Sequence, residues 1–173
     1  KDRGYSGFLG KNLFEEENQF SGSDAQRAED LQYCLDNPGI KAILCARGGY
    51  GTVRIIDNID FSGFRHNPKW LCGYSDVTVL HNKITSLGIE SLHSTMPINF
   101  GTNSSEAVDS LFCILSGESP EYNFTKHPFN RVGQTEGILT GGNLSMIYSQ
   151  CGSETAPQTD GPILFIEDLD EYL

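Results

Sequence analysis

The chain has 173 residues, of which 38% are hydrophobic, 10% aromatic and 20% charged, and this composition excludes the disordered and collagen-like classes of protein. Its formal net charge of -11 argues against nucleic acids and anionic membrane surfaces as partners, because both are bound through clustered Lys and Arg. A chain of this length can build one complete domain and part of a second, and it contains no apolar stretch near the length that crosses a bilayer.

The first predicted elements are a helix and a strand. Ser23 opens a capping box, and apolar residues recur at helical spacing as far as Leu35, before Asn37-Pro38-Gly39 ends the helix. The apolar run 40–46 has the length and flanks of a buried strand, and it leads directly into the glycine-rich loop 47–51. A strand therefore ends in a glycine loop.

Helices and strands continue to alternate after this loop, which indicates a parallel sheet covered by helices and an α/β fold. Gly88 is well placed to cap the C-terminus of the predicted helix 76–87. The predicted elements are a helix over 53–56, a loop around Asn67-Pro68, a strand over 69–73, a helix over 76–87, a strand over 89–93 and a helix over 104–115.

Residues 118–131 are rich in Pro, Asn, Lys and His and show no periodicity, so we interpret them as a linker. The linker would separate an N-terminal α/β domain, residues 1–117, from the start of a second, mixed and strand-rich domain, residues 132–173, which is too short for a core of its own. Within this second part we predict strands over 133–139 and 162–166, with a glycine turn and a short helix over 141–148.

The five cysteines lie far apart, mostly inside apolar runs, and no pair has the spacing of a zinc or redox motif. This pattern predicts reduced, buried thiols and a cytoplasmic protein. The cysteines are Cys34, Cys45, Cys72, Cys113 and Cys151.

Ser75 lies at the turn between a predicted buried strand and a predicted helix. A hydroxyl in that position is exposed at the carboxyl end of the sheet, and the helix N-terminus offers N–H groups to a developing oxyanion, so Ser75 is a candidate nucleophile. The turn departs from the G-x-S-x-G pattern, because Val77 occupies its final position. The alternative is that Ser75 or Asp76 only caps the helix.

The loop 47–51 follows another strand, so its backbone should lie at the same edge of the sheet as Ser75. Glycine allows a main-chain N–H to approach a ligand closely. A phosphate cradle is a rival interpretation, although the Lys-Ser/Thr pair of a P-loop and the G-x-G-x-x-G spacing are both missing. The other rival interpretation is that the loop is a plain tight turn.

Glu167 follows the predicted strand 162–166 and leads an acidic group that includes Asp168, Asp170 and Glu171. A carboxylate at a strand end could orient a catalytic imidazole and stabilise its charged form. The acidic group could instead hold a divalent cation or be a solvated strand exit.

None of the four histidines is an obvious catalytic base. His81 lies almost two helical turns after Ser75, so we expect it to be a packing or capping group, whereas His93 ends a strand and could border the site. His66 and His127 fall in predicted loops.

Four segments in this order resemble the signature of the LD-carboxypeptidases, serine peptidases that include muramoyltetrapeptide carboxypeptidase and the microcin-immunity peptidases. The resemblance runs from about Gly22 to the end of the chain. The segments are Arg47-Gly48-Gly49-Tyr50-Gly51, Gly73-Tyr74-Ser75-Asp76-Val77-Thr78, Gly141-Gly142-Asn143-Leu144-Ser145 and Leu164-Phe165-Ile166-Glu167-Asp168.

The resemblance implies that Ser75 attacks a terminal amide, that Glu167 belongs to a Ser-Glu-His triad, and that the backbone N–H groups of Gly49 and Asp76 form the oxyanion hole. It also assigns substrate binding to Gly48, Tyr50 and Asn143. In the family the histidine follows the glutamate by some tens of residues, so we expect it beyond Leu173. Because the chain also begins at Lys1 without Met, we expect it to be truncated at both ends. Without the histidine, we expect it to be nearly inactive alone.

The resemblance further implies release of the terminal D-alanine from a muropeptide tetrapeptide, without a metal or organic cofactor, in cytoplasmic cell-wall recycling. Family members are commonly dimers, which makes a homodimer an expectation. Two alternatives stay open: a microcin-immunity peptidase that cleaves a peptide–nucleotide conjugate with the same triad, and a non-catalytic peptide-binding module with the same fold.

Overall fold

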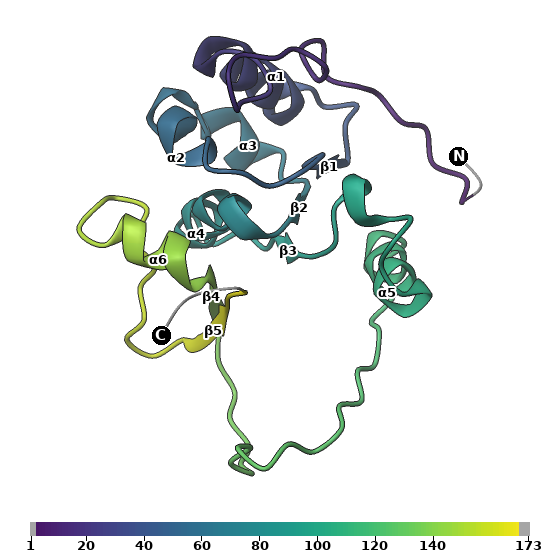
Figure 1. Ribbon diagram of the computed structural model, residues 1–173, viewed down its shortest axis with the longest axis vertical. Coiled ribbons are helices and arrows are strands. Elements are labelled where there is room, and N and C mark those ends of the chain that lie inside the picture. Colours follow the sequence, from purple (N-terminus) through teal and green to yellow (C-terminus); the bar gives the residue numbers. More distant parts are fainter. Residues whose placement is uncertain (1–2, 170–173) are drawn as a thin grey trace.

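The computed structural model describes residues 3–169 and has the α/β architecture that the sequence predicts (Figure 1). Three parallel strands form a sheet in the order β1-β2-β3, and helices connect them. The strands are β1 (Ala42–Leu44), β2 (Trp70–Gly73) and β3 (Leu92–His93), and the helices up to residue 115 are α1 (Asp24–Asp36), α2 (Thr52–Ile55), α3 (Ser62–His66), α4 (Thr78–Ser86) and α5 (Ser105–Leu115). Short 3-10 turns follow α2, β2 and β3: η1 (Ile56–Asn58), η2 (Ser75–Val77) and η3 (Pro97–Asn99).

Local signals in the sequence set several helix ends. The Ser23 hydroxyl accepts a hydrogen bond from the Gln26 backbone N–H, and the Gln26 side chain accepts one from the Ser23 N–H, which completes the predicted capping box of α1. Gly88, with a φ of 74°, follows the end of α4, and the Ser104 hydroxyl caps α5. These predicted ends are confirmed.

One hydrophobic core joins the helices to the central strand. Its fully buried members include Leu35 of α1, Phe64 of α3, Leu71 of β2 and Ile84 of α4. Burying a side chain of this size contributes about 1.5–3 kcal/mol, so these contacts fix the position of β2, which carries the candidate nucleophile at its end. Met146 joins the same core from a later helix.

That later helix belongs to a second segment, in which two strands pair in parallel: β4 (Leu139–Asn143) and β5 (Ile163–Glu167), with α6 (Leu144–Gln150) between them. The segment packs on α4, as Figure 1 shows. The Asn143 N–H donates to the Thr78 hydroxyl at 3.0 Å, and the Asn82 amide donates to the Gln150 side chain at 3.1 Å. The helix that begins just after Ser75 is therefore also the support of the second segment.

The predicted strand over 133–139 is wrong, because only Leu139 lies in β4, which continues through Gly141 and Gly142. Both glycines have positive φ, 123° and 136°, and a Cβ added at Gly141 would lie 2.0 Å from the Phe165 carbonyl oxygen. Gly141 thus allows the close approach of β5 and Gly142 that of Thr78 in α4, and the two glycines lie in a strand rather than in the predicted turn.

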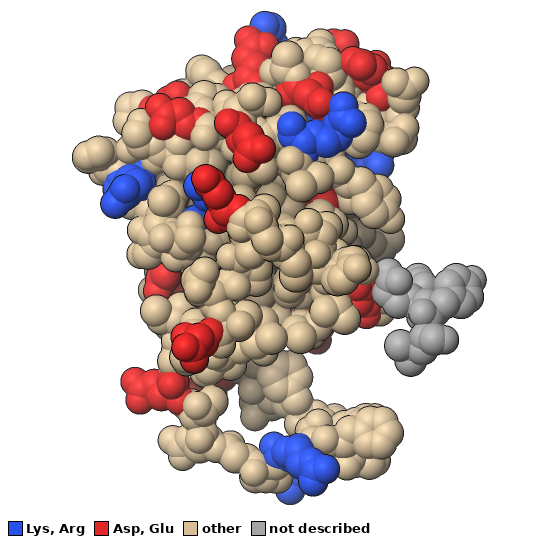
Figure 2. All heavy atoms as spheres, turned by 90° about the vertical axis from the view of Figure 1, so that its left-hand side faces the viewer, with Lys and Arg blue, Asp and Glu red and all other residues tan. Residues whose placement is uncertain are grey.

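Residues 116–138 contain neither helix nor strand and extend below the body of the protein (Figure 2). This segment includes the predicted linker. Further differences from prediction are small: α3 was not predicted, and β1 and β3 are shorter than 40–46 and 89–93. Of the five free cysteines only Cys72 is buried, and Cys151 is exposed. Within residues 3–169, no helix is long and apolar enough to cross a membrane.

Candidate active site

Ser75 has an unusual backbone conformation. Its φ is 63°, and among the described residues only Asn18 shares a positive φ outside glycine. A serine in the left-handed region costs about 1–3 kcal/mol and persists only where its surroundings hold it, a form of strain that concentrates at functional sites. The turn runs from β2 directly into η2 and α4, as a nucleophile turn requires.

His81 holds the strand end that precedes Ser75. Its Nε2 lies 2.9 Å from the Gly73 carbonyl oxygen and its Nδ1 lies 2.8 Å from the Ser91 hydroxyl, so Nε2 donates to the carbonyl and Nδ1 accepts. Burial lowers the pKa of His81 to about 4, against a weaker opposing effect of the Gly73 hydrogen bond, so the ring is neutral at neutral pH. His81 is thus a buried packing group, one of the two predicted alternatives, and it also holds the strand end before Ser75.

The glycine loop lies directly beside the serine side chain. A Cβ added at Gly48 would lie 3.1 Å from both Cβ and Oγ of Ser75, closer than most real Cβ contacts, so a larger residue at position 48 would push against the serine side chain. A Cβ added at Gly49 would meet nothing within 4 Å, and 79% of the Tyr50 surface is exposed. The loop therefore presents backbone next to the hydroxyl and an open side toward solvent.

Glu167, at the end of β5, carries a partly buried carboxylate with 27% of its side chain exposed. Its Oε1 is buried and has no hydrogen-bond partner within residues 3–169. Burial and the charge of Asp168 raise the pKa of Glu167, and a hydrogen bond from Asn143 opposes the rise. This carboxylate oxygen is available to accept a hydrogen bond.

His93 lies between the glutamate and the nucleophile turn. Its Nε2 is 3.8 Å from Glu167 Oε1, beyond hydrogen-bond distance, and its ring packs edge-on against Phe165 with centroids 5.0 Å apart. The centroid of the Tyr74 ring, in the residue before Ser75, lies 6.3 Å from that of His93, and burial lowers the pKa of His93. Sequence reasoning placed His93 near the site but missed its contact with the second segment.

Asp168 is engaged by the N-terminus of α6. It accepts hydrogen bonds from the Asn143 amide at 2.9 Å, the Ser145 backbone N–H at 3.0 Å and the Ser145 hydroxyl at 2.8 Å. Asn143 Oδ1 in turn accepts from the Met146 N–H at 3.1 Å, so a contact of Asn143 with substrate would be made alongside these bonds. Asp168 is thus a helix-capping residue.

The rest of the acidic group, Asp170 and Glu171, lies outside the described residues. Within the described part of the chain, no group of three or more His, Cys, Asp or Glu side chains could hold a metal ion.

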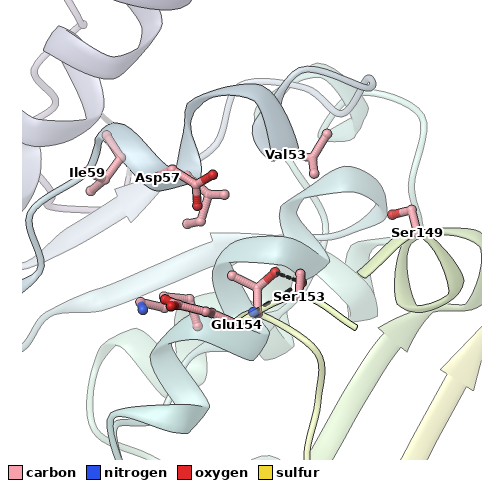
Figure 3. A pocket seen from close by; sticks show the side chains of 9 residues that line it. Val53, Asp57, Ile59, Ser149, Ser153 and Glu154 are labelled. Atoms are coloured by element: carbon pink, nitrogen blue, oxygen red, sulfur yellow. Dashed lines mark hydrogen bonds between the residues drawn. The ribbon is translucent and has the colours of Figure 1, made fainter. Parts of the chain in front are cut away.

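The larger cavity lies away from this site. It encloses about 530 Å³ between the α2–η1 region and the residues that follow α6, and Figure 3 shows Asp57 and Ile59 on one side and Ser153 and Glu154 on the other. None of the candidate site residues lines it. A smaller cavity, of about 380 Å³, is lined by residues between Leu13 and Ser21 and by Arg47, which begins the glycine loop.

Comparison with known families and proteins gives a consistent result. The sequence model of the LD-carboxypeptidase N-terminal domain matches residues 1–94, and that of the LD-carboxypeptidase C-terminal domain matches residues 136–173. A Bacillus subtilis protein described as a probable murein peptide carboxypeptidase is 37% identical over 169 residues, which cover 94% of this chain and 53% of that protein.

Solved structures agree. A muramoyltetrapeptide carboxypeptidase from Oxalobacter formigenes aligns with a TM-score of 0.82 and 28% identity, over 95% of this chain and 56% of that one. An MccF-like protein from Bacillus anthracis aligns with a TM-score of 0.72 and 27% identity, over 88% of this chain and 54% of that one. The chain spans about half the length of the curated relatives it matches.

Proposed function

Because the chain belongs to the LD-carboxypeptidase family, we propose that it carries the nucleophile and the acidic triad member of a serine-type carboxypeptidase acting on murein peptides. The observation that carries this proposal is the left-handed Ser75, with the backbone of Gly48 against its hydroxyl. A helix-capping serine needs neither the strained φ nor the adjacent glycine loop.

In the proposed reaction, Ser75 Oγ attacks the carbonyl carbon of the terminal peptide bond as a base removes its proton. The backbone N–H groups of Gly49 and Asp76 hold the negative charge of the tetrahedral intermediate, which collapses to an acyl-enzyme as the terminal amino acid leaves with the proton. Water then attacks the acyl-enzyme by the same route and releases the shortened peptide.

We assign the base to a histidine that follows Glu167, in the Ser-Glu-His order of the family, and the orienting carboxylate to Glu167. The buried Oε1 of Glu167, which has no hydrogen-bond partner within residues 3–169, supports this role, since a triad carboxylate accepts a hydrogen bond from the N–H of the catalytic imidazole. We therefore expect residues 1–173 alone to be nearly inactive. Ordinary turnover of a tetrapeptide by this chain alone would contradict the assignment of the base.

For the substrate, we propose a muropeptide tetrapeptide that loses its terminal D-alanine in cytoplasmic cell-wall recycling, and we assign substrate contacts to Gly48, Tyr50 and Asn143. The murein and muramoyltetrapeptide carboxypeptidases among the similar proteins support this choice. The likeness to an MccF-like protein favours the second candidate, cleavage of a peptide–nucleotide conjugate by the same residues.

The test uses the full-length protein. We expect D-alanine release from a murein tetrapeptide and a fluorophosphonate adduct on Ser75, with both lost in Ser75→Ala, whose kcat should fall by at least about a thousandfold. Ser86→Ala is the matched control, because the Ser86 hydroxyl is exposed at the end of α4 and donates to the Lys83 carbonyl. Cleavage of only the peptide–nucleotide conjugate would indicate the second candidate, and the absence of both adduct and cleavage a binding module.

A further inference from the structure

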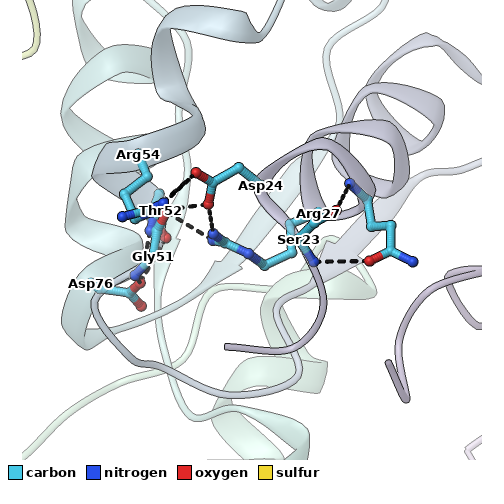
Figure 4. Close-up of polar contacts among 8 residues, drawn as sticks. Ser23, Asp24, Arg27, Gly51, Thr52, Arg54 and Asp76 are labelled. Carbon is cyan, nitrogen blue, oxygen red and sulfur yellow. Dashed lines mark hydrogen bonds and ion pairs between the residues drawn. The ribbon is translucent and has the colours of Figure 1, made fainter. Parts of the chain in front are cut away.

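The carboxylate of Asp76 connects the nucleophile turn to the glycine loop. It is 5% exposed, and its Oδ2 accepts three hydrogen bonds: from the Gly51 N–H at 3.2 Å, the Thr52 N–H at 3.2 Å and the Thr52 hydroxyl at 2.8 Å (Figure 4). Asp76 directly follows Ser75, and its donors lie where the glycine loop ends. One buried oxygen therefore ties together the two segments that flank the candidate oxyanion hole.

Gly51 is held from its other side as well. Arg27 of α1 donates to the Gly51 carbonyl oxygen at 2.8 Å, and Arg27 is itself paired with Asp24, which also binds Arg54 at 2.7 Å (Figure 4). A Cβ added at Gly51 would lie 2.2 Å from the Arg27 guanidinium. Both polar backbone groups of Gly51 are thus fixed by side chains, whereas Gly49 and Tyr50 face open space.

We infer that the Asp76 side chain is a positioning residue for the proposed reaction: it fixes the end of the glycine loop and so holds the Gly48–Gly49 backbone at its close approach to Ser75. An oxyanion hole stabilises the transition state only if its donors are already in place, and removal of one donor costs about a hundredfold to a thousandfold in kcat. This inference rests on the proposed function. It adds to the backbone N–H of Asp76 a separate role for the carboxylate.

The experiment compares variants of the full-length enzyme. Asp76→Asn keeps the size of the side chain but presents an acceptor without charge, and we expect kcat to fall about a hundredfold while KM stays within about threefold. The rate of fluorophosphonate labelling at Ser75 should fall in parallel. Thr52→Val removes only the hydroxyl donor, so its kcat should fall by a smaller factor, about fivefold.

Asp60→Asn is the matched control. At the start of α3, Asp60 accepts hydrogen bonds from the Ser62 N–H and hydroxyl, both at 2.8 Å. Asp60 therefore bonds the start of a helix as Asp76 does, but these bonds do not involve the glycine loop. We expect this variant to keep the parental kcat and labelling rate. A change in melting temperature without a change in kcat is the signature of a merely structural role.

A folded Asp76→Asn protein whose kcat and labelling rate stay within about twofold of the parent would overturn the inference. If Asp76→Asn does not fold, Thr52→Val decides, and unchanged kcat and labelling in that variant would overturn the inference. The proposed function fails separately, if Ser75→Ala retains D-alanine release.

Discussion

The two strand ends that carry the candidate triad residues are built differently. The end of β2, with Ser75, is surrounded by buried polar groups that are already satisfied, namely Asp76 and His81. The end of β5, with Glu167, follows residues 164–166, which are 37–49% exposed. The Oε1 atom of Glu167 has no hydrogen-bond partner within the described residues. The position of the serine is thus set by dense local contacts, and that of the glutamate by the packing of the second segment on α4.

Replacing the Glu167 carboxylate, whose Oε1 has no hydrogen-bond partner within the described residues, tests the function of the β5 end and should give the largest effect. In the full-length enzyme, Glu167→Gln should lower kcat by about a thousandfold, because a triad carboxylate orients and stabilises the imidazolium. The melting temperature should stay the same or rise, since burial already disfavours the charged form. Kinetics and thermal unfolding measure both, and parental kcat in this variant would remove Glu167 from the triad.

Disturbing the packing on α4 should give the next largest effect. Gly142→Ala places a Cβ 2.5 Å from the Thr78 hydroxyl at a φ of 136°, so the clash and the backbone strain together should cost about 3–4 kcal/mol of the free energy of unfolding. Gly152→Ala is the matched control, because Gly152 also has a positive φ but open space around it. Its cost should be about 1 kcal/mol, measured by urea denaturation. Equal losses in the two variants would contradict the docking of β4 on Thr78.

Acid should lower the free energy of unfolding through His81, which lies at the serine-bearing end of β2. The pKa of His81 is lowered by burial to about 4, below the value of about 6.5 in the unfolded chain, so the unfolded state binds the proton first as the pH falls. The stabilisation is complete above about pH 6.5 and is lost as the pH falls toward 4, by on the order of 3 kcal/mol.

Urea denaturation at several pH values measures this dependence. The loss of the free energy of unfolding between about pH 6.5 and about pH 4 should be smaller in His81→Gln, by on the order of 3 kcal/mol. His66→Gln, at an exposed position on α3, should behave as the parent. An identical slope in His81→Gln would show that other groups carry the acid sensitivity.

The smallest effect is expected at the start of α1, outside the two strand ends. Ser23→Ala removes half of the capping box of α1 and should lower the free energy of unfolding by about 1 kcal/mol. Because the Ser23 hydroxyl bonds, among the described residues, only the Gln26 N–H at the start of α1, kcat should remain parental. A fall in kcat at unchanged stability would mean that α1 influences the site more directly than its contact through Arg27 indicates.

The sequence predicted those features that depend on neighbouring residues. Ser23 and Gly88 mark helix ends through contacts within a few positions, and the turn at Ser75 follows from a strand that meets a helix. The path of β4 was not predictable, because its glycines form a strand only when β5 pairs with them. The hydrogen bonds from Gly51 and Thr52 to Asp76 also escaped prediction, since they join residues about 25 positions apart and no local pattern records them.

The contact of Gly142 with Thr78 has a consequence for exchanging parts between relatives. A Cβ at position 142 would lie 2.5 Å from the Thr78 hydroxyl oxygen, so a residue larger than glycine has no room there while Thr78 is unchanged. Chimaeras that graft a foreign second segment onto this nucleophile helix should therefore assemble when that segment has glycine at the position of Gly142, or when both positions are transplanted together. The contact between positions 142 and 78 thus constrains which serine-bearing and glutamate-bearing halves can be combined in one protein.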